Sequence, residues 1–296
     1  MEKQMLYSIG KVSKICDVSQ RMLRYYEEIG LIVPDRIAEP SHYRYYSVQT
    51  MQRIQLVRYL IDEGFRLGEI REILCKEDLG YFCEMFLKKV DQTQEKIEYY
   101  NQRLDSLKAW YALLVEGSAA YRHQNRAIMM RYIPMGKYFY YERQREPGEA
   151  DPGAFLETEY YTQSKRNGHS MVDMGGAFHV KYDSFQERME DAYHRMTLLV
   201  TVFPHCKSTK NTLDFGGFLA VATYHIGSRD DVRDDYERMI LWAQQHQFRL
   251  RGDCLERHVL DVYSTVREEN FVTELLLPVE EDTADLGRLE EWTLIK

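Results

Sequence analysis

The sequence predicts an α+β protein with several domains: a small helical head, one long helix and a larger domain of mixed strands and helices. Three observations predict it. Short helical patterns fill the first quarter of the chain, a heptad repeat without Gly or Pro follows, and the remainder is rich in Tyr, Phe and strand-like runs. A chain of 296 residues has room for about two domains. The predicted boundaries are 1–76, 77–120 and 121–296.

The head begins with two short helices joined by a tight turn. Ile9, Val12 and Ile15 share one apolar stripe of the first helix, which ends near Asp17. Ser19 is suited to cap the second helix by accepting a backbone N–H. A loop then ends in a basic, aromatic hairpin around residues 43–46. This order predicts a winged helix-turn-helix.

The second helix turns Arg and Tyr toward one side, which suits the major groove of DNA and its phosphates. Arg21 is a candidate for reading a base edge, because Arg pairs well with guanine. Tyr25 is expected at the surface and Tyr26 in the core. For Lys14 the alternative is a solvated surface lysine. The predicted DNA contacts are Lys14, Ser19, Arg21, Arg24, Tyr25, Arg44 and Tyr46.

Charge is distributed unevenly along the chain. Residues 1–60 hold nine Lys and Arg against six Asp and Glu, a balance of +3, whereas the remainder has a balance of −11. This asymmetry favours nucleic acid binding at one end, with chance surface variation as the alternative. The five cysteines are scattered and form no C-x-x-C pair. We therefore expect a reducing cytoplasm, no disulfide framework and no metal site. No cofactor is expected either. No apolar run has the length of a membrane span.

The segment from Tyr81 to Val115 has no Gly or Pro and shows a sustained heptad repeat. It predicts a coiled-coil helix that forms a homodimer. The alternative is an amphipathic helix packed on its own body. The helix is expected to end at Glu116-Gly117-Ser118. The heptad positions are Phe86, Val90, Thr93, Ile97, Tyr100, Leu104, Leu107, Tyr111 and Leu114.

The last section alternates strand and helix patterns. Strand–helix–strand–strand order occurs twice, which predicts a pseudo-repeat. The region between Tyr193 and Leu213 gives no clear pattern. The expected helices are 153–166 and 230–247, and the expected strands are 128–133, 137–141, 176–182, 217–225, 254–262 and 272–278.

Two carboxylates lie within apolar strands of this section, Glu256 and Glu274. Burying an unpaired carboxylate costs several kcal/mol, so it protonates or takes a cation such as a ligand. The alternatives are a strand edge that faces water or an ion pair with Arg. Aromatic rings attract organic cations, although most such rings are simply core. The candidate pocket residues beside the two glutamates are Tyr138, Tyr140, Phe178, Tyr224, Tyr236, Trp242 and His258.

The head resembles the DNA-binding domain of the MerR family of transcription regulators. The similar residues are LRYYEEIGLI at 23–32, Tyr43-Arg44 before Tyr46, and Gly64-Phe65 followed by LGEI at 67–70. One departure is His42, where the family usually has Gly. The resemblance implies antiparallel pairing of the long helices, a palindromic site in a promoter spacer, and a dimer that distorts this DNA so that RNA polymerase engages the promoter.

The last section resembles the GyrI-like ligand-binding domain. The similarity lies in ATYHIG at 222–227, CLERH at 254–258 and TELLLPV at 273–279. Together with the head, it implies the multidrug-sensing branch of the family and a lipophilic, cationic effector held by buried glutamate and aromatic rings. Since some GyrI-like domains are hydrolases, the rival interpretation is an enzyme in which Glu256 works with Tyr236 or Tyr224. A third is a drug-sequestering protein with a vestigial head.

Overall fold

The computed structural model describes residues 5–145, 152–170 and 172–280. It divides into two compact units, Met1–Glu98 and Tyr99–Lys296, and each is described by itself. The C-terminal end of the predicted third domain, residues 281–296, lies outside the described residues.

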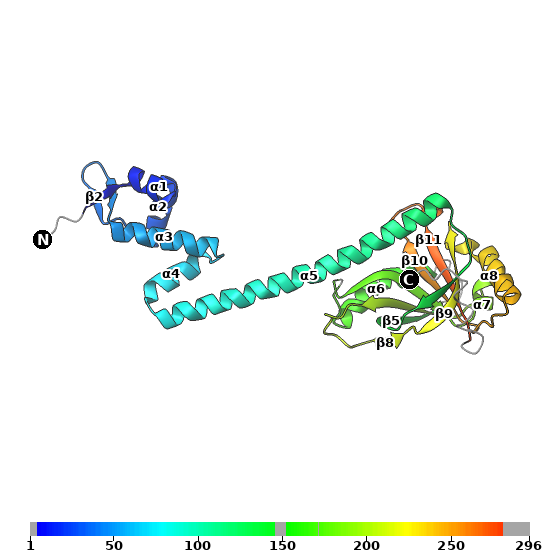
Figure 1. Cartoon of the computed structure of the whole chain (residues 1–296). Coiled ribbons are helices and arrows are strands. Elements are labelled where there is room, and N and C mark those ends of the chain that lie inside the picture. The colour runs from blue at the N-terminus through cyan, green and yellow to red at the C-terminus, as the bar shows by residue number, and fades with distance from the viewer. Residues whose placement is uncertain (1–4, 146–151, 171, 281–296) are drawn as a thin grey trace. The chain divides into compact units, whose positions relative to one another are not determined.

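The first unit is a helical head with a three-stranded sheet (Figure 1). Its helices are α1 (Ile9–Cys16), α2 (Gln20–Glu28), α3 (Val48–Asp62), α4 (Leu67–Lys76) and the first turns of α5 (Leu79–His123). The antiparallel sheet has the order β1 (Tyr7–Ser8), β3 (Tyr43–Tyr46) and β2 (Arg36–Ala38). The predicted helices and hairpin are therefore present.

One predicted core position in the head is wrong. Ile15 is 51% exposed, whereas Cys16 is fully buried together with Val12. The reason is the helical period of about 3.6 residues. Cys16, four residues after Val12, completes about one turn and faces the core, whereas Ile15, three residues after Val12, points away from it at this end of the helix. Leu23 and Tyr26 are buried as predicted.

Helix α5 runs to His123 and does not end at Glu116-Gly117-Ser118 as predicted. A Cβ atom on Gly117 would lie 2.4 Å from Cγ of Leu260. The glycine therefore serves a close helix–strand approach instead of a helix stop. Apolar heptad side chains are exposed in the single chain, among them Ile97, Leu104 and Tyr111.

The second unit is built on an eight-stranded antiparallel sheet with the order β4-β9-β11-β10-β6-β7-β5-β8. The helices α6, α7 and α8 accompany it (Figure 1). The strands are β4 (Met129–Ile133), β5 (Gly136–Gln144), β6 (Met174–Tyr182), β7 (Arg195–Val202), β8 (Thr212–Phe215), β9 (Phe218–Ile226), β10 (Cys254–Leu260) and β11 (Val272–Pro278). The helices are α6 (Pro152–Arg166), α7 (Phe185–Met189) and α8 (Arg233–Gln245), with short 3-10 turns at Arg229–Asp231 and Glu268–Asn270.

The predicted pseudo-repeat is visible in the strand order. The chain passes through β5-α6-β6-β7 and later through β9-α8-β10-β11. In the sheet these halves appear as β9-β11-β10 and β6-β7-β5, which are related by a pseudo-twofold axis between β10 and β6. The expected strands and helices are present, whereas α7, β7 and β8 were not predicted. β7 and β8 lie in the region that gave no clear pattern.

The two faces of this sheet have different coverings. The larger core lies on one face, under α6 and α8, and contains Phe139, Tyr236 and Leu275. The opposite face carries a second apolar cluster that includes Tyr138, Leu255 and Leu276. The end of α5 packs on this same opposite face, where Leu113 and Ala120 form a third apolar cluster with Tyr224 and Val259. Because successive side chains of a strand point to opposite faces, alternate residues pack against α6 and α8 or lie on the face of α5.

Candidate functional site

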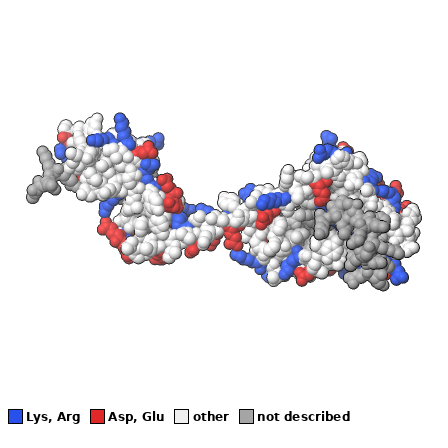
Figure 2. Space-filling model, in the orientation of Figure 1, with Lys and Arg blue, Asp and Glu red and all other residues white. Residues whose placement is uncertain are grey.

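The helix-turn-helix presents the predicted basic and aromatic side chains to solvent. Ser19 caps α2 as predicted, since its side chain accepts a hydrogen bond from the Met22 amide at 3.1 Å. Arg21 and Arg24 are exposed, and Tyr25 is 42% exposed. Lys and Arg side chains lie along the edge that α1 and α2 form (Figure 2). Lys14 is also exposed, on α1.

The hairpin after α2 differs from the prediction at one residue. Arg44 is partly exposed and forms an ion pair with Glu27 of α2, which fixes the strand against the helix. Tyr46 is fully buried, and burial raises its pKa to about 12. Its assignment to the DNA backbone is therefore wrong, because the side chain faces the core. His42 adopts φ of 53°, the left-handed conformation that Gly would adopt easily.

The predicted pocket residues of the second unit do not lie together. Strand pairing places Tyr138, Tyr140, Tyr224 and Glu274 on the face where α5 ends. The other candidates lie on the face that α6 and α8 cover. This second group consists of Glu256, Phe178, Tyr236, Trp242 and His258.

Glu256 is fully buried on the helix-covered face and is paired with an arginine. Nε of Arg188 donates to its Oε1 at 2.8 Å, and Nη2 donates to Oε2 at 3.3 Å. Tyr236 adds a hydroxyl donor at 3.1 Å. Burial opposes the charge of Arg188, but Glu256 outweighs it and the pKa of Arg188 is raised. The prediction that Glu256 awaits a cationic ligand is wrong, because Arg188 of α7 already neutralises it.

Glu274 lies in a second ion cluster, on the opposite face, and is only 1% exposed. Its Oε2 accepts from Nε of Arg257 at 2.6 Å, and its Oε1 accepts from Arg131 of β4. Glu274 is therefore not unpaired either. The two partners differ, however, because the side chain of Arg257 is 9% exposed and that of Arg131 is 31% exposed.

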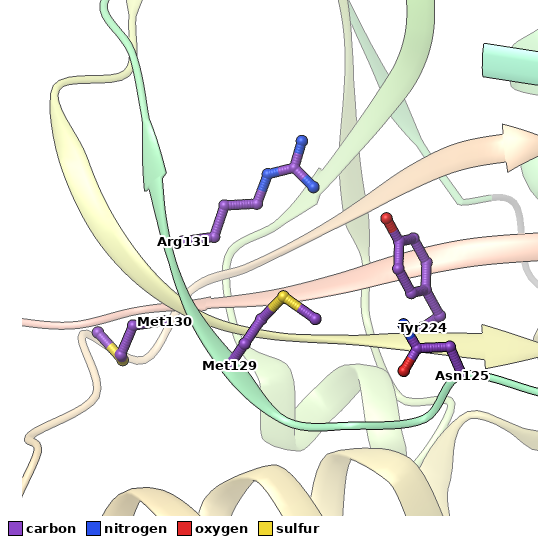
Figure 3. Close-up of a pocket in the computed structure, with 5 residues that line it drawn as sticks. All are labelled: Asn125, Met129, Met130, Arg131 and Tyr224. Carbon is purple, nitrogen blue, oxygen red and sulfur yellow. The ribbon is translucent and has the colours of Figure 1, made fainter. Parts of the chain in front are cut away.

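A small pocket of about 100 Å³ opens beside Arg131. Figure 3 shows Arg131, Met129 and Tyr224 projecting to one side of the strands, and Met130 to the other. Asn125 completes the lining. A thioether and a phenol ring next to a partly exposed guanidinium form a mixed apolar and polar site.

The sequence interpretation missed the arginines of both clusters and two further groups. Arg257 follows Glu256 directly, so strand alternation could have placed it on the face of Glu274. Glu116 lies between Leu113 and Ala120 at helical spacing, a signal that it shares their packed face. His179 is buried beside this cluster, and burial together with the charge of Arg257 lowers its pKa to about 3. No signal predicted Arg188, because α7 was not recognised.

Two further properties bear on function. Within the described ranges, no group of three or more His, Cys, Asp and Glu is placed to hold a metal ion. None of the helices described is both long and apolar enough for a transmembrane span.

Comparison with known proteins matches the two units to two families. Residues 7–77 match the MerR HTH family regulatory protein, and residues 158–280 match the GyrI-like small molecule binding domain. The mercuric resistance operon regulatory protein of Bacillus cereus is 33% identical over 99 residues, 32% of this chain and 74% of that protein. The multidrug-efflux transporter 2 regulator of Bacillus subtilis is 22% identical over 275 residues, 93% of this chain and 97% of that protein.

A solved structure also matches over most of the chain. The cryo-EM structure of the EcmrR–DNA complex in EcmrR-RPo covers 93% of this chain and 99% of its own, with 18% identity and a TM-score of 0.38.

Proposed function

Because this chain belongs to the MerR family of helix-turn-helix regulatory proteins, we propose that it binds a palindromic promoter spacer as a dimer and distorts it when a lipophilic cation occupies its C-terminal domain. The chain is a transcription regulator with a GyrI-like small-molecule-binding domain. The name of the Bacillus subtilis relative, a multidrug-efflux regulator, supports a drug-like effector. We also propose that the chain is cytoplasmic and that it contacts RNA polymerase at the promoter.

The DNA-binding part rests on the exposed side of α2. Arg21 is proposed to read a base edge, while Arg24 and Tyr25 contact phosphates, since all three are solvent-accessible on one short helix. Arg44 is held by Glu27 close to that helix and adds a further cation. Arg21→Ala should relax sequence preference, whereas Arg24→Ala should weaken binding to every sequence and reduce its salt dependence. A gel shift with the DNA upstream of its own gene would measure both.

The dimer is proposed from the exposed heptad stripe of α5. Ile97, Leu104 and Leu107 are each about half exposed, which leaves a long apolar seam in contact with water. A second copy of the helix would cover it.

The domain limits 1–76, 77–120 and 121–296 remain our proposal, with α5 extended to His123.

The effector part rests on one observation: Glu274 is buried, and one of its two partners is partly exposed beside a pocket. Arg131 is the more solvated of the two partners, so water offsets part of the cost of displacing it, whereas the buried Arg257 has little such compensation. A lipophilic cation would place its charge at Oε1 of Glu274 and its apolar body against Met129 and Tyr224.

A pair of probes with one shape and opposite charge tests this site. Tetraphenylphosphonium should bind the full-length chain, and tetraphenylborate should bind at least about tenfold more weakly, a difference of about 1.4 kcal/mol. Glu274→Gln should abolish this preference, while Glu142→Gln, an exposed carboxylate on β5, should leave it unchanged. Stronger binding of the borate would refute the cation site and point to Arg131 as an anion site.

DNA distortion needs its own measurement. The expected result is a change in the footprint of the promoter spacer at saturating effector. Identical footprints with and without effector would remove this part of the proposal.

The hydrolase alternative gains no support from the geometry. A general base must reach its substrate, but Glu256 is fully buried and paired with Arg188, and Tyr236 is fully buried beside it. Recovery of intact ligand after incubation, measured by mass spectrometry, is the expected outcome. Release of a product would favour the enzyme. A shifted band in the gel experiment would exclude simple drug sequestration by a protein with a vestigial head.

A further inference from the structure

The last turns of α5 bring a carboxylate onto the sheet, next to the proposed effector site. Oε1 of Glu116 accepts a hydrogen bond from the Tyr224 hydroxyl at 2.6 Å. Both of its oxygens accept from Arg257, with Nη1 to Oε2 at 3.2 Å and Nη2 to Oε1. Leu113 and Ala120 bury their side chains on either side of this contact. Glu116 therefore ties the helix end to β9 and β10.

Two guanidinium groups connect Glu116 to Glu274. Arg257 donates to both carboxylates, through Nε to Glu274 and through its terminal nitrogens to Glu116. Arg131 pairs with Glu274 and has its Nη1 3.9 Å from Oε1 of Glu116. The four side chains form a closed ring with two negative and two positive charges. In such a network a change at one member alters the interactions of the others.

Glu116 remains charged in this ring. Burial alone would raise its pKa, but the charge and hydrogen bonds of Arg257 and the hydroxyl of Tyr224 outweigh burial and hold the pKa below its usual value. At neutral pH the Glu116 carboxylate is therefore ionised and able to bind a second guanidinium group. Within the described residues, Glu116 is the carboxylate of α5 that makes ion pairs with β4 and β10.

We propose that Glu116 transmits effector binding to the long helix by taking over the guanidinium of Arg131. The inference rests on the proposed function, since it needs a cation at Glu274. That cation displaces Arg131, whose Nη1 has only the 3.9 Å gap to close toward Glu116. The long 3.9 Å ion pair between Arg131 and Glu116 then becomes a direct hydrogen bond, and the end of α5 binds the sheet more tightly. Coupling is reciprocal, so a state of α5 that favours this docking raises effector affinity.

Hydrogen–deuterium exchange on the full-length chain tests the coupling, with tetraphenylphosphonium as the cation. In the wild type the cation should slow exchange of the amides at 113–123 by at least about fivefold, the lower end of ordinary coupling. Glu116→Gln should lose this protection and, because the coupling is reciprocal, should bind the cation about fivefold more weakly than wild type. Asp105→Asn removes an exposed charge of α5 that makes no ion pair within the described part of the chain, and it should behave as wild type.

A second variant separates coupling from a merely structural role of Glu116. Arg131→Met removes both the competitor and the transmitting group, so the cation should bind more tightly and yet give no protection of α5. Retained protection in either Glu116→Gln or Arg131→Met would overturn the proposal while leaving the cation site intact. Failure of the cation to bind the wild type would instead refute the cation site, and the coupling would fall with it.

Discussion

His179 gives the sharpest quantitative prediction for the C-terminal domain. It lies on β6 directly opposite Arg257 and is 8% exposed. Burial first, and the charge of Arg257 second, lower its pKa from 6.5 to about 3. Its Nδ1 has no hydrogen-bond partner among the described residues. The folded domain therefore holds a neutral imidazole, whereas the unfolded chain takes up a proton below pH 6.5.

The sign and size of the effect follow from these two pKa values. A lowered folded pKa stabilises the domain fully above the unfolded value of 6.5, and this stability is lost as the pH falls toward 3. Each pH unit below 6.5 costs about 1.4 kcal/mol, so at pH 4.5 the loss is about 2.7 kcal/mol. His179→Leu removes the proton acceptor and fills the site with apolar atoms. The variant should therefore gain about 2–3 kcal/mol relative to wild type between pH 7.5 and 4.5.

Urea unfolding of the C-terminal domain at pH 7.5, 6, 5 and 4.5 measures this difference directly. Other titrating groups contribute to both proteins and cancel in the comparison. His123→Gln, at the exposed end of α5, is the matched control and should run parallel to wild type. A constant free-energy difference between wild type and His179→Leu at all four pH values would refute the reasoning.

Three further outcomes are expected. Arg188→Met leaves the buried Glu256 without its ion-pair partner and should cost about 3–5 kcal/mol of unfolding free energy, and the added change Glu256→Leu should restore most of it. Thermal unfolding of Arg188→Met at the wild-type temperature would contradict a stabilising ion pair. Tyr46→Phe removes a buried hydroxyl that has no hydrogen-bond partner among the described residues. The head should therefore keep its stability or gain up to about 1–2 kcal/mol, and its DNA affinity should not change. Loss of DNA binding in a gel shift would support Tyr46 as a DNA contact after all. Leu104→Asp should weaken the proposed dimer at least about 30-fold, or about 2 kcal/mol, whereas Gln102→Asp, outside the heptad seam, should not. Light scattering that shows dimers of unchanged stability would exclude the seam.

Local signals in the sequence predicted the elements well, because capping and periodicity act over a few residues. Ser19 caps α2, and β11 has the predicted limits Val272–Pro278. The same signals do not say which of two faces a strand residue meets. Glu256 and Glu274 have similar apolar neighbours in the sequence, yet they lie on opposite faces of the sheet.

The partners of the two glutamates depend on long-range pairing, which one sequence does not reveal. Arg188 comes from α7, 68 positions before Glu256, and Arg131 lies 143 positions before Glu274. Tyr46 shows the same limit in the head. A Tyr that ends a basic hairpin has the composition of a DNA contact, and only the packing of the hairpin on α1 turns it inward. The arrangement of charges was therefore less predictable than the fold.

Gly117 restricts the way in which α5 can carry a signal. Moving the helix along its axis by one residue, about 1.5 Å, and turning it in register would bring a side chain against Leu260, where even one carbon atom has no space. The contact between Gly117 and Leu260 therefore opposes sliding of α5 along its axis. Lifting the helix end away from the strand as a body avoids this clash, so Gly117 favours docking and undocking over sliding.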